Sequence, residues 1–145
     1  MFNMATFKTF EDIEAWQKSR ILADKIYRLS REGDFSRDFK LRDQVNGAAG
    51  SIMDNIAEGF EREGTREFVQ FLSIAKGSAG EVRSQLYRVL DHGYISQESF
   101  NELQEEVITI SKQISGLMNY LKRSELKGTK FIHEPEEPYQ VDPEP

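Results

Sequence analysis

Residues 65–93 read TREFVQFLSIAKGSAGEVRSQLYRVLDHG, and their apolar side chains recur alternately every fourth and every third residue. This spacing keeps returning to one face of an α-helix, so it predicts a long helix with a single buried seam. Thr65 is the expected N-cap, and Gly93 is expected to end the helix after His92. The seam positions are Phe68, Leu72, Ala75, Ala79, Val82, Leu86 and Val89.

Two further segments show the same helical rhythm. One begins near Ser96 and places on one face Phe100, Leu103, Val107, Ile110, Ile114, Leu117 and Leu121. The other spans 36–58 and places on one face Leu41, Val45, Ala48, Ile52 and Ile56. Gly59 is the expected residue just beyond this second helix, because glycine adopts positive φ without strain.

A fourth helix is predicted from Thr9 to Arg31, with Thr9 and Asp12 forming a capping box at its start. It carries two apolar stripes about 120° apart at roughly 100° per residue. The first stripe contains Ile13, Trp16, Ala23 and Tyr27, and the second contains Ala15, Leu22, Ile26 and Leu29. One bundle core buries only one stripe well, so this helix is expected to have a neighbour on each side. Leu22, Ile26 and Leu29 are the candidate contact with another copy of the chain.

The predicted fold class is all-α, an antiparallel up-down-up-down four-helix bundle. No segment alternates with the two-residue period of a strand, and short breaks make consecutive helices antiparallel neighbours. The bundle is expected to occupy residues 1–123. Residues 124–145 hold two lysines, six acidic residues and all four prolines, a net charge of -4. This composition predicts a flexible, acidic, Pro-rich tail.

Composition excludes several classes of function. The 145 residues include no Cys and only two His, which excludes disulfides, thiolate zinc sites and cysteine nucleophiles. No apolar run is long enough to span a membrane, and the N-terminus lacks the features of a secretory signal, so a cytoplasmic location is expected. His133 stands alone among glutamates and makes a poor metal site. We therefore expect no enzyme, no cofactor, no bound metal and no small-molecule substrate.

Small residues cluster in two of the predicted helices. They are Ser73, Gly77, Ser78, Ala79 and Gly80 in one helix, and Ala48, Ala49 and Gly50 in another. Interior glycines cost helix stability, about 0.8–1 kcal/mol each relative to alanine, so they imply a compensation. The favoured interpretation is a close crossing of these two helices; the alternative is a gap that binds a ligand.

Basic residues gather in the first two predicted helices and the loop between them. They are Lys18, Arg20, Lys25, Arg28, Arg31, Arg37, Lys40 and Arg42, and four acids in the same region leave a net charge of +4. Such a face could follow the phosphates of RNA or DNA. The alternative is a solvated surface with ion pairs one turn apart, such as Asp24 with Arg28 and Asp38 with Arg42. The whole chain carries a net charge of -6, which favours this alternative.

Two sequence blocks resemble the family of 23S rRNA intervening-sequence proteins. The first is DQVNGAAGSIMDNIAEGFER at 43–62, and the second is FLSIAKGS at 71–78. The opening FEDIEAWQK at 10–18 is also similar to the start of that family, so the resemblance covers about residues 7–121. The chain departs from the family pattern at Asn46-Gly47, where many members have paired basic residues, and at Met53, where many have proline.

The resemblance implies a four-helix bundle that assembles as a homopentamer and has no enzymatic activity. One branch of the family, the accessory protein of diversity-generating retroelements, binds a reverse transcriptase and nucleic acid. The leading functional hypothesis is therefore an oligomeric adaptor for RNA, DNA or a reverse transcriptase. The alternative is a structural or protein-interaction bundle with no role in binding nucleic acid.

The resembling blocks also supply candidate site residues, namely Asn55, Glu58, Gly59, Arg62, Lys76, Gly77 and Ser78. Asn55 and Glu58 share a helix face near the end of its helix, where a glutamate opposes the helix dipole. Glu58 therefore needs a partner such as Arg62 or Arg66. The favoured interpretation is a bracket that shapes the turn between the second and third helices; the alternative is a shared binding site.

Overall fold

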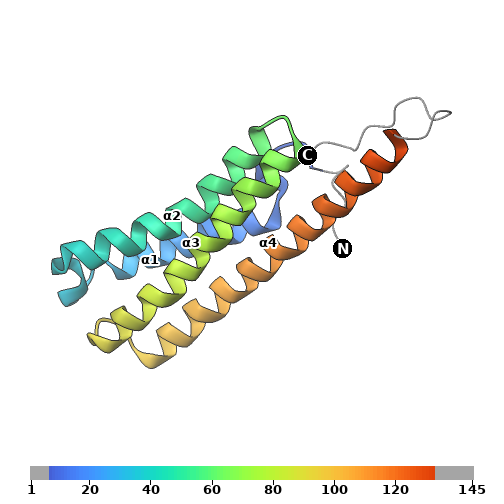
Figure 1. Cartoon of the computed structure of the whole chain (residues 1–145). Helices are drawn as coiled ribbons and strands as arrows, with labels where there is room; N and C mark the ends of the chain where they lie inside the picture. The colour runs from blue at the N-terminus through green and yellow to red at the C-terminus, as the bar shows by residue number, and fades with distance from the viewer. Residues whose placement is uncertain (1–6, 133–145) are drawn as a thin grey trace.

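The computed structural model describes residues 7–132, and every regular element within them is helical. The four α-helices are α1 (Glu14–Leu29), α2 (Phe39–Glu61), α3 (Thr65–Asp91) and α4 (Gln97–Ile132). Two short 3-10 helices, η2 (Phe10–Asp12) and η3 (Gly33–Arg37), precede α1 and α2. Consecutive helices pack on one another and α1 also packs on α4, which confirms the predicted four-helix bundle (Figure 1).

The predicted seams of α2, α3 and α4 form the core. All seven apolar positions predicted on α3 and all seven predicted on α4 are buried, and so are the five predicted on α2. Side chains cap two of the helices: the Ser99 N–H donates to Ser96 Oγ at 3.0 Å, and the Leu41 N–H donates to Asp38 Oδ1 at 3.2 Å. The predicted N-cap Thr65 is instead the first residue of α3, and Gly64 occupies the cap position. The repeating apolar spacing was therefore sufficient to identify the buried face of three helices.

The two stripes of α1 take the opposite roles from those predicted. Leu22 is 0% exposed and Ile26 is 1% exposed, because this stripe faces the core of its own bundle. They cannot form the contact with another copy, and that prediction is wrong; Leu29 is also partly buried against the core. The other stripe loses Ile13, which is the extended N-cap residue of α1 and is itself buried. Of its remaining members, Tyr27 is 49% exposed, whereas Trp16 and Ala23 are partly buried against the core.

Gly59 was predicted to lie just beyond the end of α2, but the helix continues to Glu61. Its role is steric. A Cβ at this position would lie 2.6 Å from Phe71 Cβ and 2.9 Å from Phe68 Cδ1, both on α3. Glycine is therefore required by the close approach of α3 to α2. Gly93, in contrast, has a φ of 77° just beyond α3, which confirms its predicted role.

The glycines of α3 do not form the predicted close crossing. Gly77 and Gly80 are exposed, and a Cβ on either of them, or on the partly buried Gly50 of α2, would meet no atom within 4 Å. Other members of the two predicted clusters, Ala49 and Ala79, are buried, and Ser78 Oγ donates a 2.9 Å hydrogen bond from α3 to Ser51 Oγ of α2. The small exposed residues have no packing explanation within one copy of the chain.

The α4 helix continues past the predicted domain boundary at residue 123 and reaches Ile132 (Figure 1). The first part of the predicted tail is therefore helical, and residues 133–145, including His133, lie outside the described part of the chain. None of the described helices is long and apolar enough to cross a membrane.

Candidate functional site

The most distinctive surface lies on α1 and consists of Trp16, Ala23 and Tyr27, which we call the α1 stripe. An arginine stacks on each of its two aromatic rings: the Arg20 guanidinium carbon is 5.9 Å from the Trp16 ring centroid, and that of Arg31 is 5.2 Å from the Tyr27 ring centroid. Protein interfaces are enriched in tryptophan, tyrosine and arginine, so the composition of the stripe is typical of a contact surface.

A third stack of the same kind lies at the start of α2. Phe39 is 62% exposed, and the Arg42 guanidinium carbon lies 4.8 Å from its ring centroid. These stacks were not predicted, although the sequence contains a signal for them. In each case an arginine follows an aromatic residue by three or four positions, which places both on the same helix face.

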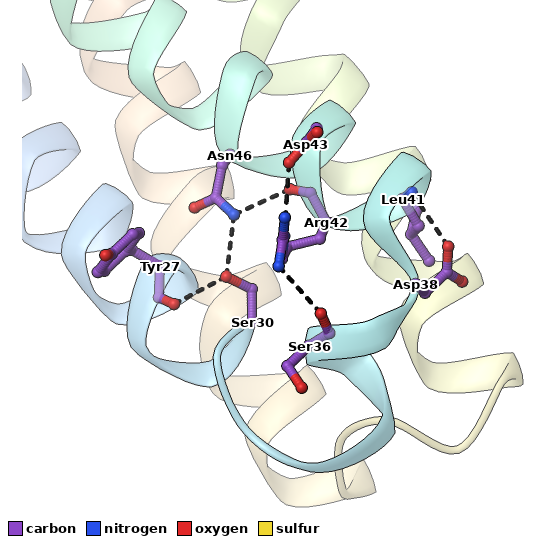
Figure 2. Close-up of polar contacts among 8 residues, drawn as sticks. All are labelled: Tyr27, Ser30, Ser36, Asp38, Leu41, Arg42, Asp43 and Asn46. Carbon is purple, nitrogen blue, oxygen red and sulfur yellow. Dashed lines mark hydrogen bonds and ion pairs between the residues drawn. The ribbon is translucent and has the colours of Figure 1, made fainter.

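Hydrogen bonds tie the end of α1 to α2 beside the stripe (Figure 2). Asn46 Nδ2 of α2 donates to Ser30 Oγ at 2.9 Å and to the Arg42 carbonyl at 2.8 Å. The buried Ser30 hydroxyl in turn donates to the Tyr27 carbonyl at 2.7 Å. Asn46 stands where many members of the resembling family carry a basic residue, and here its amide joins two helices.

The predicted basic face is largely neutralised by neighbouring carboxylates. Five of its eight residues are in ion pairs: Lys18 with Glu14, Lys25 with Glu102 and Glu106, Arg28 with Asp24, Arg37 with Asp34, and Arg42 with Asp43. The Asp24–Arg28 pair, at 2.8 Å, was predicted from the sequence. Among the described residues, the three that have no carboxylate within ion-pair distance are Arg20, Arg31 and Lys40.

The predicted ion pair between Asp38 and Arg42 does not form, because the Asp38 carboxylate accepts hydrogen bonds from other donors. The Tyr94 hydroxyl donates to Asp38 Oδ2 at 2.9 Å, and the Leu41 N–H occupies the other oxygen. These two hydrogen bonds hold the pKa of Asp38 below its ordinary value, and the same contact raises the pKa of Tyr94. Asp38 thus joins the start of α2 to the segment between α3 and α4.

The two sequence blocks at 43–62 and 71–78 form a bracket between α2 and α3. Glu58 accepts a hydrogen bond from Arg62 Nη2 at 3.0 Å, and Arg62 Nη1 lies 3.7 Å from Glu67 Oε2. The Arg62 guanidinium carbon also lies 4.9 Å from the centroid of the Phe71 ring. Arg62 therefore connects the last turn of α2 to the first turns of α3, next to the close approach at Gly59.

A second link of the bracket lies further along the two helices. Asn55 Nδ2 donates to the Ser51 carbonyl and to Ser51 Oγ, and Ser51 Oγ accepts a hydrogen bond from Ser78. Lys76 and Gly77 are not part of this link, since both are exposed on α3. The structure therefore separates the candidate residues into a bracket and an outward-facing pair, and the possibility of a shared binding site stays a prediction.

Residues 7–132 contain no group of three or more histidine, cysteine, aspartate or glutamate side chains placed to hold a metal ion.

Comparison with known proteins agrees with this description. The model of the 23S rRNA-intervening sequence protein family matches residues 11–116. A crystal structure of a protein of unknown function from the S23 ribosomal protein family of Bacteroides thetaiotaomicron superposes with a TM-score of 0.66 and 22% sequence identity, over 72% of this chain and 97% of that one. Among curated proteins, none matches the chain. Because the family model covers most of its length, the chain belongs to the 23S rRNA-intervening sequence protein family.

Proposed function

We propose that this chain is a non-catalytic scaffold that associates with further copies of itself through the α1 stripe. The observation that carries the proposal is the exposure of Tyr27 on the face of α1 that also holds the partly buried Trp16, with an arginine stacked on each of the two rings. An exposed aromatic ring with arginines close by is typical of contact surfaces. The resemblance to homopentameric relatives makes a ring of five the expected assembly, closed by a head-to-tail interface.

Fluorescence tests this proposal at the stripe itself, because Trp16 is the only tryptophan in the chain. Tyr27→Glu introduces a negative charge, and burying that charge in an interface costs free energy because it loses its hydration. We expect it to shift the Trp16 emission to longer wavelength and to make Trp16 easier to quench with acrylamide. The matched control is Tyr87→Glu on α3, since Tyr87 is 53% exposed and Tyr27 is 49% exposed. Equal quenching in wild type and both variants would contradict the proposal.

Nucleic-acid binding is a second candidate function, supported by Arg20, Arg31 and Lys40. Each is exposed and lacks a carboxylate partner in the described structure, so each is available to a phosphate. Bound phosphates release counterions, and about 0.9 unit of negative slope in log K against log salt is expected for each phosphate contact with duplex DNA. Titrating labelled DNA and RNA at several salt concentrations should give this slope, and Arg20→Gln should reduce it. Binding that does not depend on salt would exclude the candidate.

A reverse transcriptase is the protein partner that the resemblance to the retroelement accessory proteins suggests for such a scaffold. Support for it is limited to that resemblance. Co-elution of the purified chain with a purified reverse transcriptase encoded beside its gene, and loss of co-elution with Tyr27→Glu, would support this partner. Independent elution of the two proteins would contradict it.

A further inference from the structure

A hollow between α1 and α4 has the opposite character to the α1 stripe. Its volume is about 380 Å³, and we call it the α1/α4 groove; it is lined by Lys18, Ile21, Glu102, Glu105, Glu106 and Thr109. Ile21 is 54% exposed and supplies an apolar surface within it. Lys25 bridges one end by contacting Glu102 and Glu106, and at the other end Gln113 Nε2 donates to Glu14 at 2.8 Å.

The α1/α4 groove is acidic in net terms. Its lining cation Lys18 already has a partner in Glu14, and Lys25 beside it is shared by two glutamates. Glu105 is exposed, and no described cation lies within ion-pair distance of it. An incoming positive charge would therefore find a carboxylate without a competing partner.

We infer that the α1/α4 groove receives the α1 stripe of a second copy of this chain. Arg20 and Arg31, which stack on the rings of the stripe, carry charges that complement Glu105. The exposed ring of Tyr27 offers an apolar surface to the exposed Ile21. This inference rests on the proposed self-association and adds the surface that receives the stripe.

The position of the two surfaces on α1 permits a head-to-tail assembly. Ile21 in the groove and Ala23 in the stripe are two residues apart, so they lie roughly 160° apart around the helix. One copy can therefore offer its stripe on one side of α1 and receive the next stripe on the other side. Repeated contacts of this kind are heterologous, and they close into a ring when the rotation between copies allows it.

A charge swap tests the inference. Glu105→Arg should place like charges in the contact and raise the concentration needed for half-assembly about tenfold or more. Adding Arg20→Glu or Arg31→Glu to the same chain should restore assembly, because the arginine introduced at position 105 then faces a glutamate on the next copy. The matched control is Glu81→Arg on α3, which makes the same change in net charge outside the groove and should have no effect.

Ile21→Ser tests the same contact without changing any charge. Its control is Ile74→Ser, because Ile74 on α3 is 51% exposed and therefore similar to Ile21 in exposure. Ile21→Ser should weaken assembly and Ile74→Ser should not; circular dichroism checks that every variant is folded. The inference would be overturned if Glu105→Arg still assembled like wild type. It would also be overturned if Glu105→Arg prevented assembly and neither Arg20→Glu nor Arg31→Glu restored it. If Tyr27→Glu still separates the copies in that case, the proposed function stands and only the receiving surface is wrong.

Discussion

Replacing Gly59 with alanine should destabilise the fold, whereas the same change at Gly47 in the same helix should stabilise it. The new Cβ at position 59 would lie 2.6 Å from Phe71 Cβ, which is attached directly to the α3 backbone and cannot rotate away. Carbon atoms pack best about 3.5–4.0 Å apart, so α2 and α3 would have to separate locally by roughly 1 Å. A Cβ at position 47 would meet no atom within 4 Å.

The expected magnitudes follow from two opposing effects. Overpacking a well-packed contact costs about 1–3 kcal/mol. Replacing glycine by alanine inside a helix recovers about 0.8–1 kcal/mol. Gly59→Ala should therefore lower the free energy of unfolding by up to about 2 kcal/mol, and Gly47→Ala should raise it by about 0.5–1 kcal/mol.

Urea unfolding followed by far-ultraviolet circular dichroism measures both variants, at one protein concentration because self-association makes stability concentration-dependent. For a chain of this size, 1 kcal/mol corresponds to a change in Tm of about 2–4 °C. A Gly59→Ala variant as stable as Gly47→Ala would refute the reasoning that glycine is required by the approach of α3.

Three further outcomes are expected. Leu72→Ala and Leu86→Ala should each cost about 2–5 kcal/mol, because both leucines are buried on the α3 seam; Tm values equal to wild type would show that the seam is not core. Asp38 has a lowered pKa, so its contribution to stability is present above about pH 4 and is lost as the pH falls through the folded-state pKa. Tyr94→Phe should therefore flatten the acid limb of stability against pH, and an unchanged limb would contradict this assignment. Ending the chain at Arg123 should preserve folding and assembly, because the buried seam of α4 ends at Leu121 and an exposed ion pair such as Arg66–Glu125 contributes less than about 1 kcal/mol. Aggregation of the shortened chain would show that the removed segment docks on the bundle.

The long seams of α3 and α4 could be predicted from the sequence because each contains one unambiguous apolar face. In α1 the sequence offered two stripes of similar strength, and their spacing alone could not determine which one faced the core. The structure resolves this through Ile13, which lies outside α1 as its extended N-cap residue. Without Ile13 the outer stripe lacks a large aliphatic residue, while Leu22 and Ile26 fill the core.

Glycine positions and ion pairs were harder to predict, because both depend on tertiary contacts. Gly59 follows an apparent helix end in the sequence, yet the helix continues and its side of α2 meets Phe71. Similarly, Lys25 lies close to acids of its own helix in the sequence, but its partners Glu102 and Glu106 come from α4. A count of charges along one segment cannot reveal that a distant helix neutralises it.

The mass of the chain in solution tests the central claim of self-association most directly. Light scattering coupled to size-exclusion chromatography should give wild type a mass several times the 16.8 kDa of one chain, and five times that value for the expected ring. Tyr27→Glu should elute with the mass of a single chain and retain its helical circular dichroism, whereas Tyr87→Glu should remain assembled. A wild-type mass of one chain at micromolar concentration would contradict the account.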